Sequence, residues 1–217
     1  MMQYDLVIWD LDGTLLDTSE GILLSARYAI EKENLPVPTE AIMKTYIGPP
    51  IQNSFLATLR VTKEKSLYMA EIFRQHYKKY DLYKACPYSG INNLLKAIKE
   101  NGIRQAVATY KRDDYAYAII EKFAMAQYMD CVCGSDFEGK LTKTDIIRNA
   151  IENIGIKPSK RIVMIGDTDN DLFGAEHVGI DFIGVKYGFG FKSQLDGIKV
   201  ASNVDDLRNM LLMGANT

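Results

Sequence analysis

The sequence has few cysteines and histidines, the residues that form disulfides and bind zinc. It contains three cysteines, Cys86, Cys131 and Cys133, an odd number without C-x-x-C spacing. This pattern argues against a disulfide framework and a zinc knuckle, so we expect reduced thiols packed in the core. His76 and His177 are isolated in helix-like stretches with no Cys or His at ligand spacing. We therefore expect neither histidine to bind a metal.

Long apolar runs and a surplus of positive charge are also missing. The longest apolar run near the N-terminus, residues 6–9, is far shorter than the roughly 20 residues that span a bilayer. No basic segment precedes it, as a signal peptide would require. The chain has 26 Lys plus Arg against 28 Asp plus Glu, without the basic excess that favours nucleic acid. We expect a cytoplasmic protein that binds neither membrane nor nucleic acid.

Short apolar runs alternate with segments of helical periodicity over most of the chain. The runs have the length of strands buried on both faces and lie at residues 4–10, 104–110, 130–134, 161–166 and 181–185, with a weaker sixth at 198–202. Helical spacing appears between them at residues 92–100, 113–123, 143–153 and 171–177. The alternation predicts an α/β fold, a Rossmann-like parallel sheet with helices on both faces.

One long stretch interrupts this alternation. Between residues 19 and 83 we find no convincing strand, only helical segments near 20–34, 41–45, 52–60 and 63–80. Pro36, Pro38, Pro49 and Pro50 separate the first three of these segments, since proline breaks a helix interior. The sequence thus predicts a small all-helical domain at residues 17–85, inserted after the first strand into a sheet domain formed by residues 1–16 and 86–217.

The first run is followed by Asp10-Leu11-Asp12-Gly13-Thr14. The carboxyl ends of parallel strands are where open α/β sheets bind ligands. Gly13 allows a sharp turn, so that the carboxylates of Asp10 and Asp12 can face one ligand. The plainer alternative is that Asp-Gly forms a turn with solvated acids.

A second acidic cluster, Gly166-Asp167-Thr168-Asp169-Asn170-Asp171, follows another apolar run and opens a helix. Crowded negative charge is costly unless a hard cation or a helix N-terminus offsets it. Mg²⁺ fits, because it prefers oxygen ligands and often binds carboxylates together with substrate phosphate. The alternative is an ordinary N-capping turn.

Two further residues suit phosphate chemistry. Thr109 ends the second predicted strand and Lys143 opens a helix. A hydroxyl and an ammonium at strand ends can hold phosphoryl oxygens and neutralise charge during attack on phosphorus. Neither residue is specific by itself.

In this order the elements resemble the phosphatase branch of the haloacid dehalogenase superfamily. Its four motifs are an Asp-x-Asp-Gly-Thr loop, a Thr or Ser strand end, a Lys, and Gly-Asp-x-x-x-Asp, and all four occur here. The helical insertion is similar to the small cap domain of that family. Ile47-Gly48-Pro49-Pro50 within it resembles cap sequence of phosphoglycolate-phosphatase-like and 5'-nucleotidase-like members.

The resemblance implies roles for the four acids. Asp10 would be the nucleophile and form an aspartyl-phosphate, which splits one difficult displacement into two. Asp12 would protonate the leaving group and then activate water. Mg²⁺ would be bound by Asp10, the main-chain carbonyl of Asp12 and Asp167. Asp171 would support these ligands or their waters from outside the coordination sphere.

The resemblance further implies that Thr109 hydrogen-bonds the phosphoryl group and that Lys143 holds both that group and the nucleophile. One departure follows, because Tyr110 stands where many relatives carry Asn or Ser. Its side chain could narrow the site or contact the substrate. Lys111 and Arg112 could meet an anionic leaving group, although we expect them to form a solvated helix start.

We therefore predict a Mg²⁺-dependent phosphomonoesterase, phosphoglycolate-phosphatase-like, acting on a small phosphorylated metabolite as a monomer or small homo-oligomer. A nucleoside 5'-monophosphatase and a sugar-phosphate mutase are alternatives within the superfamily. A dehalogenase would need no metal, and Asp12 and Asp167 argue against it. A phosphoacceptor signalling module is the non-enzyme alternative, and Asp12 and the insertion argue against it. Periodicity does not identify the substrate.

Overall fold

The computed structural model describes residues 4–137, 139–191 and 197–213. The chain divides into two compact units. One consists of Met1–Leu16 with Pro87–Thr217, and the other of Asp17–Cys86. In the order of the chain, the second unit follows the first strand.

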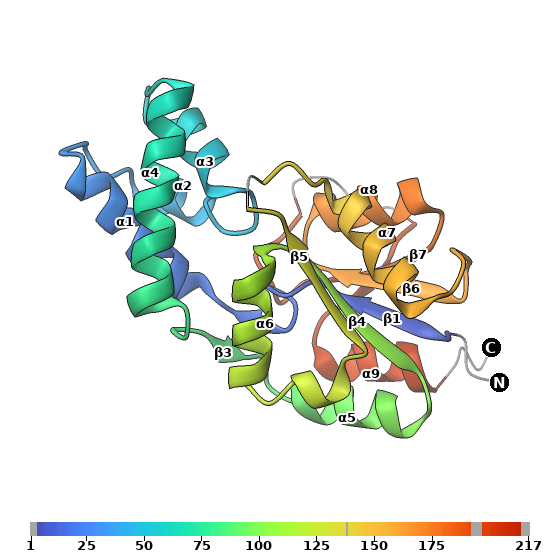
Figure 1. Ribbon diagram of the computed structural model, residues 1–217. Coiled ribbons are helices and arrows are strands. Elements are labelled where there is room, and N and C mark those ends of the chain that lie inside the picture. The colour runs from blue at the N-terminus through green and yellow to red at the C-terminus, as the bar shows by residue number, and fades with distance from the viewer. Residues whose placement is uncertain (1–3, 138, 192–196, 214–217) are drawn as a thin grey trace. The chain divides into compact units, whose positions relative to one another are not determined.

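The first unit is built on a six-stranded sheet (Figure 1), ordered β5-β4-β1-β6-β7-β8. The strands are β1 (Leu6–Trp9), β4 (Arg104–Arg112), β5 (Cys131–Ser135), β6 (Ile162–Gly166), β7 (Asp181–Val185) and β8 (Lys199–Ala201). Each strand pairs with its neighbours in parallel. The predicted parallel sheet is confirmed, including the weak sixth strand.

The order of the strands sets the place where the sheet binds ligands. From β1 the chain adds β4 and then β5 on one side, whereas β6, β7 and β8 are added on the other. The direction of winding therefore reverses between β1 and β6. In open α/β sheets, the crevice beyond the carboxyl ends of the strands at such a reversal is the usual ligand site.

Helices cover both faces of this sheet. Figure 1 shows α7 (Lys143–Ile154) and α8 (Asp169–Val178) on one face, with α5 (Ile91–Glu100) and α9 (Val204–Leu212) on the other. The remaining helices are α6 (Asp113–Lys122) and the short 3-10 helix η2 (Ala126–Tyr128). The predicted fold class is confirmed, although α9 lies outside the predicted helices.

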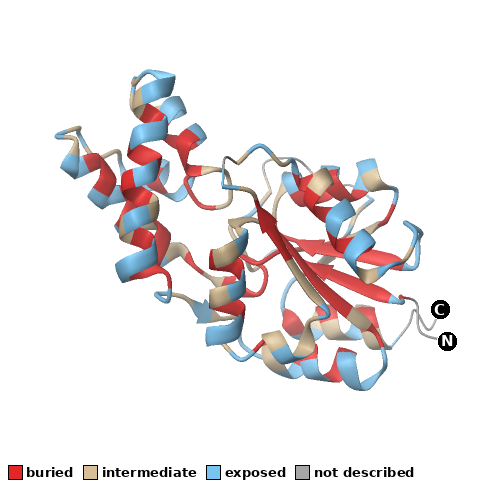
Figure 2. Ribbon diagram, in the orientation of Figure 1, coloured by how far each residue is buried: buried red, intermediate tan, exposed pale blue. Residues whose placement is uncertain are grey.

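Burial explains why the strands read as apolar runs. β1 is buried along its whole length, as is β6 (Figure 2). Side chains of the strands and of α7 form one apolar cluster that includes Leu6, Ile8, Met164 and Ile147. Strands in the middle of a parallel sheet need apolar residues on both faces, which removes the alternation typical of one-sided sheets.

The second unit is helical, as predicted. It contains α1 (Ser19–Lys32), α2 (Glu40–Lys44), α3 (Ile51–Thr58), α4 (Lys63–His76) and a π-helix, η1 (Tyr77–Asp81). The helix expected at residues 63–80 is thus α-helical only to His76. The short strands β2 (Leu16–Asp17) and β3 (Cys86–Pro87) pair where the chain passes between the units.

The cysteines follow expectation in part. All three thiols are free, with Cys133 buried and Cys131 half-buried, but Cys86 is exposed and its predicted place in a core is wrong. His76 contacts the buried carboxylate of Asp81, with 3.1 Å between Nδ1 and Oδ2. None of the helices within the described ranges combines the length and apolar character needed to cross a membrane.

Candidate active site

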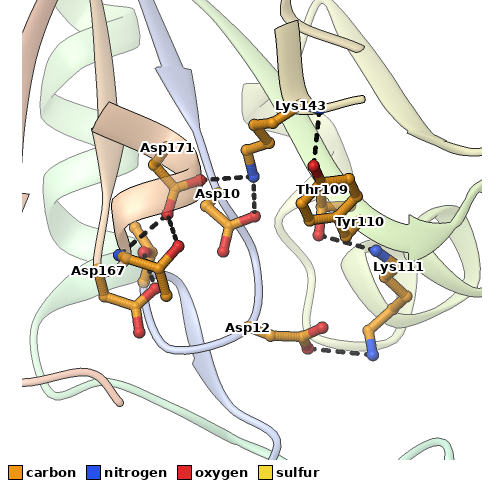
Figure 3. A network of polar contacts seen from close by, with 10 residues as sticks. Asp10, Asp12, Thr109, Tyr110, Lys111, Lys143, Asp167 and Asp171 are labelled. Carbon is orange, nitrogen blue, oxygen red and sulfur yellow. Dashed lines mark hydrogen bonds and ion pairs between the residues drawn. The ribbon is translucent and has the colours of Figure 1, made fainter. Parts of the chain in front are cut away.

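Three carboxylates meet where β1 and β6 end (Figure 3). Asp10 follows β1, whereas Asp167 and Asp171 follow β6. All three residues are buried, and one oxygen from each lies within 4.8 Å of the others. The pairing register explains this meeting, since Trp9 lies opposite Ile165 and the next residues of both strands reach the same edge.

A turn after β1 brings the two loops together. Gly13 has φ of 87°, a left-handed conformation that favours glycine. A Cβ at this position would lie 2.2 Å from Oδ2 of Asp167 and 2.7 Å from the Phe189 ring. Asp167 is fixed there by the Thr14 hydroxyl, 3.3 Å from Oδ1, and by the Phe189 N–H, 2.7 Å from Oδ2. Only glycine allows this close approach of the two loops.

Asp171 both caps the N-terminus of α8 and belongs to the three-carboxylate group. The main-chain N–H and the hydroxyl of Thr168 donate to its Oδ2 at 3.1 and 2.7 Å, which forms a capping box at the start of α8. Its Oδ1 instead lies 2.6 Å from the ammonium of Lys143. N-capping thus orients a carboxylate whose other oxygen remains in the acidic group.

Lys143 supplies the positive charge at the centre of the site. It opens α7 and is only 3% exposed. Its Nζ lies 2.6 Å from Oδ1 of Asp10 as well as 2.6 Å from Asp171. One ammonium therefore faces a group of three carboxylates, which leaves the group with excess negative charge.

This imbalance shifts the protonation equilibria. Burial is the largest cause that raises the pKa of Asp10 to about 7; the carboxylates of Asp171 and Asp12 add to the rise, and the Lys143 ammonium opposes it. Burial, followed by the charges of Asp10 and Asp171, likewise raises the pKa of Asp167. Burial alone would lower the pKa of Lys143, but the nearby carboxylates outweigh it and keep the ammonium charged.

The donor set fits a hard divalent cation. Three buried carboxylates offer oxygen ligands, and the raised pKa values of Asp10 and Asp167 indicate that one lysine does not balance the charge of the group. A divalent cation bound to such oxygens would restore the balance, and Mg²⁺ has this preference. The group is therefore able to bind a metal.

Asp12 and Lys111 form a second buried pair at the edge of this group. Lys111 Nζ lies 3.0 Å from Oδ1 of Asp12, and the two side chains are 5% and 10% exposed. Asp10 and Asp12 each pair with a different lysine, Asp10 with Lys143 and Asp12 with Lys111 (Figure 3). Lys111 is not a solvated helix start, since it lies within β4.

The other predicted residues lie on the same strand. Thr109 is 1% exposed, and its hydroxyl accepts a hydrogen bond from the main-chain N–H of Lys111 at 3.2 Å. The Tyr110 hydroxyl accepts a hydrogen bond from the main-chain N–H of Lys143 at 3.0 Å. Arg112 is bound through two nitrogens to Asp114, at 2.6 and 2.8 Å. Sequence reasoning missed the pairing of Lys111, because its position after a strand-end threonine gave no sign of its partner.

Comparison with known proteins supports the same interpretation. Residues 7–185 match the family model of the haloacid dehalogenase-like hydrolases. A 5'-nucleotidase of Pseudomonas aeruginosa is 32% identical over 195 residues, which cover 89% of this chain and 88% of that protein. A phosphoglycolate phosphatase of Agrobacterium fabrum is 29% identical over 191 residues, covering 85% and 81%.

One relative is named as a kinase and not as a phosphatase. The tyrosine-protein kinase PtkA of Mycobacterium tuberculosis is 32% identical over 213 residues, covering 95% of this chain and 72% of its own. Among solved structures, a predicted phosphatase from Clostridium acetobutylicum superposes with a TM-score of 0.90 at 36% identity, covering 97% of this chain and 99% of its own. The chain belongs to the haloacid dehalogenase-like hydrolases and is a phosphatase of that family.

Proposed function

We propose that the protein is a Mg²⁺-dependent phosphomonoesterase that hydrolyses a small phosphorylated metabolite through an aspartyl-phosphate on Asp10. The observation that carries this proposal is the buried carboxylate of Asp10, held 2.6 Å from Lys143 within a three-carboxylate group able to bind a metal. A nucleophilic carboxylate needs this setting, because a free anion in water would be solvated and poorly oriented.

Each residue then has a defined task. Lys143 orients Asp10 and offers positive charge to the phosphoryl oxygens. Thr109, buried within β4, donates its hydroxyl to the phosphoryl group. Mg²⁺, held by Asp10, the main-chain carbonyl of Asp12 and Asp167 with support from Asp171, would neutralise charge on the phosphoryl group.

Asp12 is the proposed acid and base. Its carboxyl group, in the protonated form, donates the proton to the leaving oxygen as the bond to phosphorus breaks, and the carboxylate left behind accepts a proton from the water that hydrolyses the aspartyl-phosphate. The ion pair with Lys111 keeps this carboxylate apart from Asp10, so the nucleophile and the acid do not share one lysine.

For the substrate we propose a small phosphate monoester of the phosphoglycolate type, with residues 17–85 acting as the cap domain that selects among esters. A nucleoside 5'-monophosphate is the second candidate, supported by the 32% identity to a protein named 5'-nucleotidase. A sugar-phosphate mutase would use the same residues but would return an isomeric ester.

The test is phosphate release from a panel of phosphoglycolate, nucleoside monophosphates and sugar phosphates, with Mg²⁺ or with a chelator. We expect multiple turnovers that need Mg²⁺ and are lost in Asp10→Asn. Asp169→Asn is the matched control, because Asp169 opens α8 two residues after Asp167 but lies outside the three-carboxylate group. Labelling without further release would indicate a signalling module, and bisphosphate-dependent isomerisation a mutase; either result would overturn the proposal.

A further inference from the structure

Tyr110 packs beneath the helix that carries Lys143. It lies in β4 between Thr109 and Lys111, and it contacts the apolar cluster formed by the sheet and α7. The side chain of Lys111 contacts Asp12, but the Tyr110 hydroxyl is directed to the start of α7 (Figure 3). It therefore approaches Lys143 from the side of the core.

The hydroxyl satisfies a main-chain group that the helix cannot satisfy itself. Lys143 is the first residue of α7, and the first N–H groups of a helix have no partner within it. The Thr142 side chain accepts from the N–H of Asp145 instead. The Tyr110 hydroxyl accepts from the N–H of Lys143 at 3.0 Å and so fixes the main chain from which the lysine extends.

The ring of the same tyrosine also lies near the charged end of Lys143. Nζ is 5.7 Å from the ring centroid, within the range of a cation–π contact. The same Nζ lies 2.6 Å from Asp10 and 2.6 Å from Asp171. Tyr110 thus touches both ends of a long side chain that would otherwise sample many rotamers.

We propose that Tyr110 is a positioning residue that holds Lys143 against Asp10. The inference rests on the proposed function, because Lys143 matters only if Asp10 is the nucleophile. It assigns to Tyr110 a task different from narrowing the site or contacting the substrate. The hydroxyl fixes the main chain, and the ring limits the movement of the ammonium.

The experiment compares Tyr110→Phe, which keeps the ring, with Tyr110→Leu, which removes both contacts. Tyr4→Phe is the control, because Tyr4 is buried and its hydroxyl contacts Asp181 at 3.2 Å, at the amino end of β1. We expect kcat to fall about 5-fold in Tyr110→Phe, the value for one hydrogen bond, and further in Tyr110→Leu. KM stays within about twofold, since no substrate contact is lost. Tyr4→Phe loses a similar amount of Tm but keeps its kcat.

A second readout does not depend on turnover. The rate of acetylation of Lys143, followed by mass spectrometry, should rise severalfold in Tyr110→Phe and stay constant in Tyr4→Phe. An unchanged acetylation rate together with kcat within twofold of the wild type would overturn the inference. So would an equal loss of kcat in Tyr4→Phe, or a rise in KM alone. An inactive wild-type protein would refute the proposed function, and the acetylation rates would still decide the position of Lys143.

Discussion

Asp12, the proposed acid and base, forms an ion pair with Lys111. Both side chains are nearly buried, and their charged atoms lie 3.0 Å apart. A buried ion pair is costly to form but also costly to break from one side, because the remaining charge keeps its desolvation penalty. Lys111 therefore contributes to the orientation of Asp12 as well as to stability.

We predict that Lys111→Met lowers kcat about 10-fold and the free energy of unfolding by about 2 kcal/mol, the value of a hydrogen bond to a charged group. Steady-state kinetics and urea unfolding check both values. Lys96→Met is the control, because Lys96 is 61% exposed and its 3.7 Å pair with Glu100 lies at the surface. Equal changes of kcat and of the free energy of unfolding in the two variants would show that the pair with Asp12 has no role.

The sequence predicted which residues are candidates for the site, but it did not predict the contacts between residues far apart in the chain. Asp10, Asp167 and Lys143 were predicted as candidates because their positions follow strands or open a helix, and these are local properties. The contact of Tyr110 with Lys143 joins residues 33 positions apart. The same holds for Lys111 and Asp12, since pairing across strands depends on register, which a single sequence does not reveal.

The loops after β1 and β6 pack so closely that they depend on one another for their conformation. The absence of a Cβ at Gly13 makes room for the carboxylate of Asp167. Gly166 likewise makes room for Asp171, because a Cβ added at Gly166 would lie 2.3 Å from the Cβ of Asp171. The glycines of both motifs are therefore required for the packing of the acidic group as well as for turns.

We predict that Gly13→Ala abolishes turnover and the stabilisation by Mg²⁺, because the new methyl group displaces Asp167. Gly155→Ala is the matched control, with φ of 76° and no atom within 4 Å of the added Cβ. It should cost about 1 kcal/mol from backbone strain and keep its activity. Thermal unfolding with and without Mg²⁺ separates the two. A Gly13→Ala protein that is still stabilised by Mg²⁺ would contradict the described packing.

Most helices and strands could be predicted, because burial on both faces gives strands a continuous apolar run. The exceptions have physical reasons. α9 begins after Asn203, whose side chain accepts from the N–H of Asp206, and buries Leu207 and Leu211 at helical spacing. The helical spacing of its apolar residues was present in the sequence, but only over a short segment. The change to a π-helix after His76 places Asp81 beside Ser25, a tertiary contact that periodicity does not contain.

For the whole molecule, the acidic group makes stability depend on pH and on metal. The pKa of Asp10 is raised to about 7 and that of Asp167 is also raised, so the folded protein binds protons that the unfolded chain releases. Stability then falls as pH rises whenever the folded state holds more protons. Without metal, the protein should lose stability between about pH 4 and about pH 7.

We predict that in a chelator the Tm falls by roughly 5 °C from about pH 5.5 to about pH 8, and that Mg²⁺ restores more Tm at the higher pH. Differential scanning calorimetry measures this change. In Asp10→Asn the slope should be smaller, because one of the crowded charges is removed. A metal-free protein that becomes more stable over this range would show that the group is not a site of unbalanced charge.

The most direct test of the central claim is rapid acid quenching during turnover of a radiolabelled phosphate ester, followed by mapping of the label on the protein. We predict label on Asp10, formed only with Mg²⁺ and chased into inorganic phosphate by excess unlabelled ester. Label on another residue, or phosphate release without any labelled protein while Asp10→Asn remains active, would contradict it.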